Sequence, residues 1–251
     1  MRILITGATG IVGKKLLAEL SRFNYSIRIL TRIAGRHAIN SSKLEYAIGN
    51  LEDINSLDNA TQDVDTVIHL AAITHTNNQK LYYQINTAGT KNLLKSCEKN
   101  NVKNFIFIST RVAGTEGGAY AHSKLLAEKA VRSSRLNWII LRPAEIYGAG
   151  EKEAVAKLIN MIKKSKFVPI VGSGQYSLSP VYIGDVIECI AEILQKNLFS
   201  KKIYTLAGPE EFTFTGLTDK ISETLNTDGI KIFIPVFFLK ALAFLFYLAG
   251  S

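Results

Sequence analysis

Short apolar runs alternate with stretches of helical periodicity from the start of the chain to about residue 142. A continuous apolar run of a few residues predicts a buried strand, and apolar residues recurring three and four positions apart predict an amphipathic helix. On this basis we expect strands at residues 2–6, 26–31, 44–48, 65–71, 105–109 and 138–142. Helices are expected at residues 11–23, 54–60, 83–99 and 120–131.

The order of these elements indicates the class of fold. Strands that are apolar throughout and alternate with helices form parallel sheets covered by helices on both faces. We therefore expect an α/β protein built on a doubly wound parallel sheet. After residue 150 the alternation loosens, and the expected elements are a helix at 154–164, a strand at 167–170, a loop at 172–179, a helix at 186–194, a strand at 203–207 and a helix at 215–225.

A glycine motif, Gly7-Ala-Thr-Gly10-Ile-Val-Gly13, lies between the first expected strand and the first expected helix. That context is what a dinucleotide-binding turn requires, because the glycines let the backbone approach a pyrophosphate and the helix N-terminus supplies N–H donors. The alternative, a plain strand-to-helix turn, does not need this spacing. The motif predicts a Rossmann fold, with a dinucleotide-binding domain at 1–147 plus 183–208 and a small C-terminal substrate-binding region at 148–182 plus 209–251.

The end of the second expected strand bears on the choice of dinucleotide. It reads Ile29-Leu30-Thr31-Arg32 and lacks the acidic residue that commonly holds the adenosine ribose in such domains. Arg32 could instead meet a 2′-phosphate, which favours NADP over NAD. An exposed arginine that accepts either cofactor is the alternative.

Tyr120 and Lys124 are spaced four residues apart in the expected helix at 120–131, so they share one helix face. A positive charge at Lys124 would lower the pKa of the Tyr120 phenol, which is about 10 in a free tyrosine. A phenol tuned in this way suits proton transfer to or from a sugar or alcohol hydroxyl. The pair alone is a weak signal, and a solvated helix face is its simplest explanation. Downstream of a dinucleotide motif, we interpret it as catalytic.

Composition narrows the class of partner. The chain has 251 residues, of which 47% are hydrophobic and 20% charged, as in ordinary soluble globular proteins. The net charge of +9 suggests anionic partners such as a nucleotide. The basic residues are scattered, and the densest run, Lys163 to Lys166, has no interleaved aromatic residue, so nucleic acid is not expected.

The placement of the cysteines and histidines and the start of the first strand predict a cytoplasmic protein without a disulfide or a metal site. Cys97 and Cys189 lie far apart in apolar helical patterns, and the four histidines have no ligand spacing. We therefore expect free thiols in a reducing compartment and no metal site. The first expected strand begins at Arg2, which leaves no room for a signal peptide, and cytoplasm is the expected location.

The run 232–249 is almost wholly apolar, with Pro235 and Lys240 as interruptions. It is close to the length that spans a bilayer, so membrane contact through this C-terminus is one interpretation. We favour a helix packed on the substrate region or on a second subunit of a homodimer. An ending this apolar also suggests that the natural chain continues past Ser251. The side chains expected to be hidden are Phe237, Leu239, Leu242, Phe246 and Leu248.

Seven segments in sequence order resemble one enzyme family. The chain is similar to extended short-chain dehydrogenases/reductases of the NAD(P)-dependent epimerase/dehydratase family over about residues 1–190. The matching segments are Thr6-Gly7-x-x-Gly10-x-x-Gly13, His69-Leu-Ala-Ala72, Asn86-x-x-Gly89-Thr90-x-Asn92, Ser109-Thr110, Tyr120-x-x-x-Lys124, Arg142-Pro143-x-x-x-Tyr147-Gly148 and Val181-Tyr-Ile-Gly-Asp185-Val186.

The resemblance implies an NAD(P)-dependent oxidoreductase, epimerase or dehydratase that acts on a carbonyl/hydroxyl carbon, of a nucleotide sugar above all. It implies that Thr110 hydrogen-bonds the reacting sugar oxygen, with Ser109 as a rival one residue away. Lys124 would also hold the nicotinamide ribose, Asn86 would support the fourth strand, and Pro143 would lie beside the nicotinamide. The expected cofactor-binding residues are Gly7, Thr9, Gly10, Ile11, Val12, Arg32, Asn50, Leu51, Leu70, Ala71, Ala72, Asn86, Lys124 and Pro143.

Departures from the family pattern leave the substrate open. The loop between Thr110 and Tyr120 is short for a nucleotide-sugar enzyme, Asn50 stands where the family prefers an aspartate against adenine, and Tyr182 replaces a usual histidine. One alternative is a reductase or dehydrogenase of a small or lipophilic ketone. Another is a non-catalytic NAD(P)-binding sensor or assembly subunit, which the presence of the Tyr120/Lys124 pair disfavours.

Overall fold

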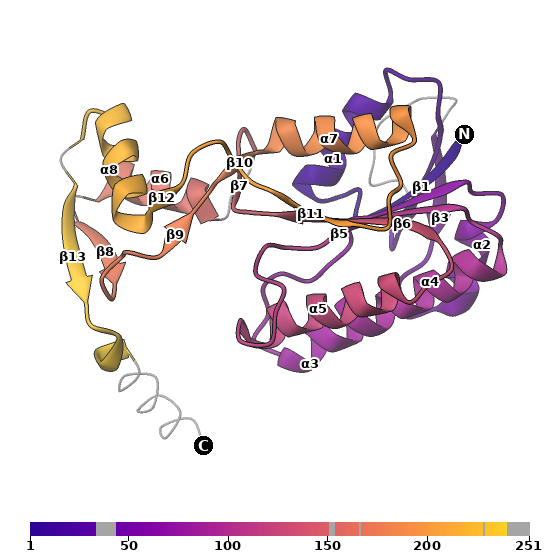
Figure 1. Cartoon of the computed structure of the whole chain (residues 1–251), viewed down its shortest axis with the longest axis horizontal. Coiled ribbons are helices and arrows are strands. Elements are labelled where there is room, and N and C mark those ends of the chain that lie inside the picture. The colour runs from indigo at the N-terminus through magenta and orange to yellow at the C-terminus, as the bar shows by residue number, and fades with distance from the viewer. Residues whose placement is uncertain (34–43, 151–153, 166, 228, 240–251) are drawn as a thin grey trace. The chain divides into compact units, whose positions relative to one another are not determined.

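The computed structural model describes residues 1–33, 44–150, 154–165, 167–227 and 229–239 (Figure 1). The chain divides into two compact units. The first unit comprises Met1–Pro143 and Ile183–Leu206. The second unit comprises Ala144–Tyr182 and the residues from Ala207 onward.

A seven-stranded sheet forms the centre of the first unit, in the order β11-β6-β5-β4-β1-β2-β3 with every neighbouring pair parallel. The strand order reverses between β1 and β4, and a reversal of this kind opens a crevice at the carboxyl ends of the strands. This topology confirms the predicted doubly wound α/β class. The strands are β1 (Arg2–Thr6), β2 (Ser26–Thr31), β3 (Leu44–Ile48), β4 (Thr66–His69), β5 (Asn104–Ile108), β6 (Asn137–Pro143) and β11 (Ile203–Leu206).

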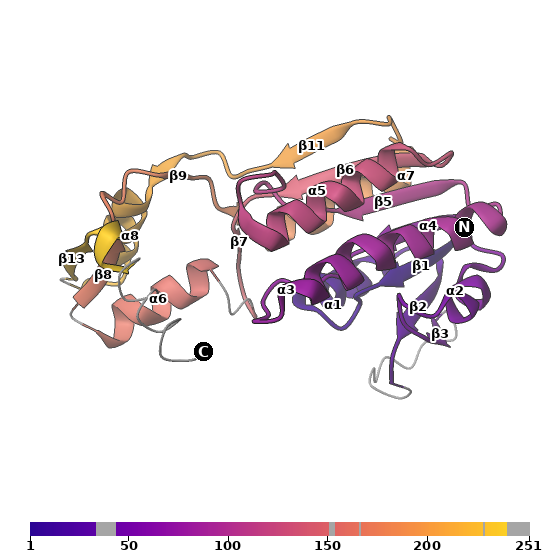
Figure 2. The ribbon, with the colours of Figure 1, turned by 90° about the horizontal axis from the view of Figure 1, so that it is seen from below.

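Helices cover both faces of this sheet, which explains why its strands are apolar at consecutive positions. Ile3, Leu4 and Ile5 in β1 are all fully buried although neighbouring residues point to opposite faces. Figure 1 shows α1 and α7 on one face and α2, α4 and α5 on the other, and Figure 2 shows α4 and α5 in front of the sheet. The bounds are α1 Ile11–Leu20, α2 Ile54–Thr61, α4 Thr90–Lys99, α5 Gly118–Arg132 and α7 Ile183–Lys196.

The segment expected as one helix at 83–99 is built differently. It starts with three α-helical residues, α3 (Gln79–Leu81), continues as a π-helix, η1 (Tyr82–Gly89), and returns to α-helical geometry at α4. The π-helix buries Asn86, Thr87 and Gly89. A side chain at Gly89 would meet Leu51 at 2.8 Å, so the close packing of this segment requires glycine there. The apolar stripe runs through both helix types, so periodicity alone did not separate them.

The second unit has its own small core. In it α6 (Ala154–Lys164) and α8 (Phe214–Thr224) pack on β8 (Phe167–Val171), which pairs in parallel with β13 (Ile230–Ile234). Two short ribbons, β7 (Ile146–Tyr147) with β10 (Val181–Tyr182) and β9 (Ser177–Leu178) with β12 (Phe212–Thr213), complete the described part. The loop expected at 172–179 therefore contains a strand. The core residues are Leu158, Ile162, Val168, Ile170 and Leu217.

The apolar C-terminal run differs from its expected helix. Its first residues, 232–234, belong to β13, and helical geometry begins only at Val236. Phe237 is 72% exposed, so the prediction that it is hidden within this chain is wrong. The reason is that Phe237 lies in the helical turn after β13, and the core that α6, α8 and β8 form in this unit does not include it.

Four further side chains of this run are expected to be hidden. Leu239 is partly buried, and Leu242, Phe246 and Leu248 lie outside the described residues. No helix within the described ranges is both long and apolar enough to cross a lipid bilayer.

Candidate functional site

The glycine motif forms the turn between β1 and α1. Gly7 has a φ of +75°, and a side chain there would come within 2.5 Å of the Ala71 backbone nitrogen at the end of β4. At Gly13 a side chain would come within 2.5 Å of the Gly7 carbonyl oxygen. Only glycine satisfies both demands, a positive φ at the first position and close packing at both. Gly10 has neither a positive φ nor a close contact that would exclude a side chain, since a side chain there would lie 3.4 Å from the Gly7 oxygen.

The N-terminus of α1 is suited to an anion. Gly10 is its N-cap residue, and among the described residues no side chain caps this helix end. The first turn carries no acidic residue, and it contains Ile11 and Val12. The leading N–H groups of a helix lack partners within the helix and form the positive end of its dipole. A phosphate group placed at this turn would therefore be stabilised.

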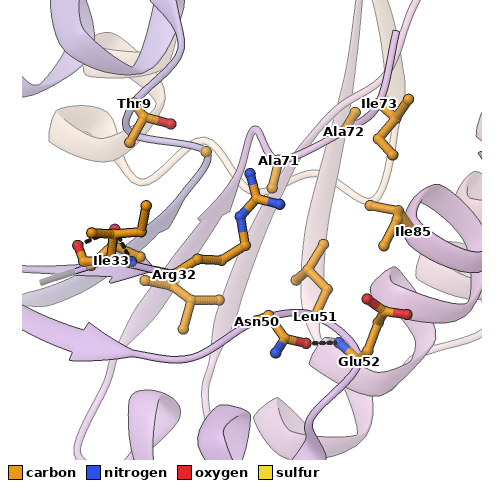
Figure 3. Close-up of a pocket in the computed structure, with 13 residues that line it drawn as sticks. Thr9, Arg32, Ile33, Asn50, Leu51, Glu52, Ala71, Ala72, Ile73 and Ile85 are labelled. Atoms are coloured by element: carbon orange, nitrogen blue, oxygen red, sulfur yellow. Dashed lines mark hydrogen bonds between the residues drawn. The ribbon is translucent and has the colours of Figure 1, made fainter. Parts of the chain in front are cut away.

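A cavity of about 240 Å³ opens beside this turn, over the carboxyl ends of β1, β2 and β4 (Figure 3). Expected cofactor residues that line it are Gly7, Thr9, Arg32, Asn50, Leu51, Ala71 and Ala72. The other expected residues, Gly10, Ile11, Val12, Leu70, Asn86, Lys124 and Pro143, are not part of this lining. The residues not foreseen are Leu30, Thr31, Ile33, Glu52, Ile73 and Ile85, most of which directly flank a motif residue in the sequence.

Arg32 and Asn50 enter the cavity in different ways. Figure 3 shows the Arg32 side chain extending across it with its guanidinium group toward Ala71. The Asn50 side-chain oxygen is engaged in its own turn, where it accepts the backbone N–H groups of Glu52 at 2.8 Å and Asp53 at 3.1 Å. An asparagine therefore supplies the same acceptor for this turn that an aspartate would.

Asn86 and Leu70 hold the end of β4. The Asn86 side chain accepts the Ile73 N–H at 2.8 Å, donates to the Ile73 carbonyl at 3.0 Å and donates to the Ser123 hydroxyl at 3.1 Å. The Leu70 N–H donates to the Thr6 carbonyl at 3.1 Å. These bonds tie the segment after β4 to α5 and to β1, and this segment forms one wall of the cavity.

Tyr120 lies in α5 and is hydrogen-bonded by the side chain of Thr110. The pKa of the Tyr120 phenol is raised, chiefly by burial and in part by the neighbouring Tyr82, while the Thr110 hydrogen bond opposes the rise. The expectation that Lys124 lowers this pKa is not met in this structure. The physical reason is that the lysine's amino group is committed elsewhere.

Lys124 is 2% exposed and points toward the end of β5. Its Nζ donates to the Ile108 carbonyl oxygen at 2.8 Å and lies 4.2 Å from the centroid of the Phe107 ring. Burial lowers the pKa of Lys124 to about 7, and the charge of Glu128 opposes that shift. An amino group with this pKa exchanges a proton near neutral pH.

The geometry separates Thr110 from Ser109, its rival for the role of reacting hydroxyl. Ser109 is buried, and its hydroxyl donates to the Glu128 carboxylate at 2.5 Å. Thr110 is the one of the two that contacts Tyr120. Pro143 ends β6, and its carbonyl accepts the Arg111 N–H at 2.9 Å, so this bond joins the end of β6 to the segment that follows β5.

A doubly wound parallel sheet with a glycine turn and a Thr/Tyr/Lys cluster defines a Rossmann protein of the short-chain dehydrogenase type. The model of the NAD dependent epimerase/dehydratase family matches residues 3–207, and the chain belongs to this family of enzymes. The family resemblance predicted from the sequence is thereby confirmed.

Known relatives cover nearly the whole chain. The UDP-glucose 4-epimerase of Vibrio cholerae is 26% identical over 97% of this chain and 82% of its own length. The N-acetyl-alpha-D-glucosaminyl-diphospho-ditrans,octacis-undecaprenol 4-epimerase of Escherichia coli O157:H7 is 29% identical over 93% of this chain and 75% of its own length. A dTDP-glucose 4,6-dehydratase from Streptomyces venezuelae, solved with NAD bound, has a TM-score of 0.79 at 21% identity, over 94% of this chain and 84% of that one. At 21% identity, the similarity to this solved structure shows that the two chains share a fold.

Proposed function

We propose that this protein is an NAD(P)-dependent oxidoreductase or epimerase that acts on a carbonyl/hydroxyl carbon of a nucleotide sugar. The observation that carries the proposal is the pairing of Tyr120 with Thr110, one helical turn from the buried Lys124. Two hydroxyl groups that contact each other can both address one substrate oxygen. Membership of the epimerase/dehydratase family and the nucleotide-sugar names of its relatives support the substrate class.

The residues present fit a dinucleotide. The closely packed turn at Gly7 and the uncapped N-terminus of α1 suit a pyrophosphate, which Gly10, Ile11 and Val12 would hold through their backbone. Lys124 and Pro143 would lie toward the nicotinamide end. When bound, the nicotinamide supplies the acceptor or donor of a hydride.

In the oxidative direction Tyr120 acts as the phenolate, takes the proton of the substrate hydroxyl and becomes the phenol, while the Thr110 hydroxyl turns from Tyr120 to donate a hydrogen bond to the same substrate oxygen. Burial holds the pKa of Tyr120 high, so the phenolate that acts as the base forms readily only when positive charge is added beside it. In the reductive direction the same phenol returns the proton. The raised pKa keeps Tyr120 protonated at neutral pH, which is the state from which it can return the proton.

NADP is the preferred form of the cofactor in this proposal. Arg32 borders the cavity at the end of β2, where a carboxylate would otherwise bind the ribose hydroxyls. A guanidinium group pairs well with a phosphate and gains nothing comparable from a free hydroxyl. Glu52 also lines the cavity, so the positive side chain of Arg32 and the negative side chain of Glu52 would both face the adenosine end of the bound dinucleotide.

The experiment that tests the function is product analysis with a panel of UDP- and dTDP-sugars. The purified protein is incubated with each sugar and with added NAD(P) or NAD(P)H, and the anomeric protons are followed by NMR. We expect one nucleotide sugar to be epimerised, oxidised or reduced, and no change with the Tyr120→Phe variant. Turnover confined to lipophilic ketones, or nucleotide binding without any turnover, contradicts the proposal and identifies one of the alternatives.

A further inference from the structure

Glu128 is a buried carboxylate, and both of its oxygens accept hydrogen bonds. It lies in α5 with 1% of its surface exposed. The Ser109 hydroxyl donates to its Oε1 at 2.5 Å, and Arg142 donates from Nε at 2.8 Å and from Nη2 at 2.5 Å. The arginine pairing is bidentate, the geometry in which a guanidinium group and a carboxylate bind most strongly and with the most fixed orientation.

These bonds join three elements at the carboxyl ends of two neighbouring strands of the sheet. Ser109 follows the last residue of β5, Arg142 belongs to β6, and Glu128 belongs to α5. Because the Ser109 hydroxyl is held by the carboxylate, the chain leaves β5 with the next residue, Thr110, free to contact Tyr120. The carboxylate thus sets which hydroxyl of the Ser-Thr pair reaches the site.

Glu128 also continues the helix face that carries the two other groups. Tyr120, Lys124 and Glu128 are spaced by four residues, so they lie one above the other along α5. A shift of α5 relative to β5 would move all three together. The pair of bonds to Arg142 resists that shift, because a buried charge cannot be left without its partner.

We propose that Glu128 is a positioning residue of the reaction, which with Arg142 and Ser109 holds Thr110 and Tyr120 against one substrate oxygen. The inference rests on the proposed function for its substrate, and on this chain's own geometry for everything else. Glu128 has no contact with the reacting atoms in this assignment.

A second effect of Glu128 is electrostatic. It is the charged group that keeps the pKa of Lys124 from falling further. The titratable groups that interact electrostatically with Lys124 are Glu128 on its own helix and His69 on β4, and Arg142 on β6 pairs with Glu128. Burial lowers the pKa of His69 to about 3, so His69 is neutral at neutral pH and Glu128 supplies the negative charge near the lysine.

The test uses Glu128→Gln and, for comparison, Ser109→Ala, which removes one bond to the carboxylate but keeps its charge. The first readout needs no turnover. NMR titration of protein labelled at lysine Nζ and at tyrosine Cζ follows Lys124 and Tyr120 directly. We expect Glu128→Gln to lower the pKa of Lys124 and to change the Tyr120 titration, while Ser109→Ala leaves the Lys124 titration in place.

The second readout is turnover of whichever nucleotide sugar the wild type converts. Misplacing reacting groups by about 1 Å costs on the order of a hundredfold in rate. We therefore expect kcat to fall by about tenfold or more in Glu128→Gln, with NAD(P)H affinity close to the wild type. If Glu128→Gln does not fold, the double variant Glu128→Met/Arg142→Met replaces the buried pair by apolar side chains and gives the same comparison.

The outcomes separate the two proposals. A folded variant with wild-type titrations of Lys124 and Tyr120 overturns the role of Glu128, whatever the substrate is. Altered titrations in a protein that converts no nucleotide sugar leave that role in place and contradict the proposed function instead.

Discussion

The rings of Tyr82 and Tyr120 lie with their centroids 5.8 Å apart and their planes inclined by 57°. Tyr82 belongs to the π-helix, and its hydroxyl donates to the Thr74 carbonyl at 3.3 Å and accepts the Thr76 N–H at 3.1 Å. The segment after β4 is thereby tied to the ring that covers Tyr120. This cover is part of the burial that raises the pKa of the Tyr120 phenol.

Tyr120→Phe removes the proton-transfer group and keeps the ring that packs on Tyr82. We expect kcat to fall by about 10²- to 10⁴-fold, the usual contribution of one general acid–base group, with unchanged NAD(P)H affinity. Tyr83→Phe is the matched control, because Tyr83 follows Tyr82 in the π-helix and its hydroxyl forms an exposed hydrogen bond with His122 at 3.2 Å. Near wild-type activity in Tyr120→Phe would remove Tyr120 from the mechanism.

Lys124→Met should make stability less dependent on pH. Burial lowers the pKa of Lys124 from 10.5 to about 7, so the unfolded chain binds the lysine proton more tightly than the folded one. Between these values the unfolded state carries the extra proton, and the stability of the wild type rises with pH by roughly 1.4 kcal/mol per unit. The gain from Lys124→Met should be largest below pH 7 and shrink toward pH 10.5.

Urea unfolding at pH 6 and pH 9 measures this difference. Lys129→Met, an exposed lysine of the same helix, is the control and should show the same small effect at both pH values. An equal gain for Lys124→Met at both pH values would mean that this lysine keeps an ordinary pKa.

Arg32→Ala should abolish the discrimination between NADPH and NADH. The wild type should bind NADPH more tightly, because the guanidinium group at the cavity can pair with a 2′-phosphate. Calorimetric titration with both cofactors measures the ratio of dissociation constants. Arg22→Ala removes an equal charge from the far end of α1 and should preserve the ratio. A wild type that prefers NADH would refute the assignment of Arg32.

Replacing either of two glycines of the β1–α1 turn by alanine should affect different properties, stability at Gly7 and dinucleotide affinity at Gly10. Gly7→Ala forces a side chain against the Ala71 backbone at a φ of +75°, so we expect a loss of about 1–3 kcal/mol in stability. Gly10→Ala has a φ of −69° and room for the methyl group, so its cost should stay below about 1 kcal/mol. Its effect should instead be weaker dinucleotide binding, because the methyl group enters the space beside the helix N-terminus. Thermal melts and NAD(P)H titration of both variants distinguish stability from affinity, and equal behaviour would contradict this division.

Much of the first unit could be predicted because its signals are local. Each strand of the sheet is a short apolar run, and the glycine turn and the Tyr120/Lys124 spacing are both contained within a few residues. The ends of elements shifted by a few residues, as in α7, which begins at Ile183 rather than at residue 186.

The remaining features depend on contacts between distant residues. Sequence could not decide between Ser109 and Thr110, because the decision comes from Glu128, far along the chain on another element. The pKa of Tyr120 was expected to fall, but the packing of Tyr82 and the direction of the Lys124 amino group are set by tertiary structure. The exposure of Phe237 likewise depends on tertiary structure, because the small core of the second unit forms without it.

The π-helix at Tyr82–Gly89 makes the number of residues in this segment matter as much as their identity. A π-helical turn holds more residues than an α-helical one, and each residue of an α-helix turns the chain by roughly 100°. Deleting one residue between Tyr82 and Asn86 would rotate Tyr82 away from Tyr120 while Asn86 kept its place. In an alignment of related chains, a gap at this position therefore signals an altered active-site wall, whereas gaps in surface loops elsewhere carry no such meaning.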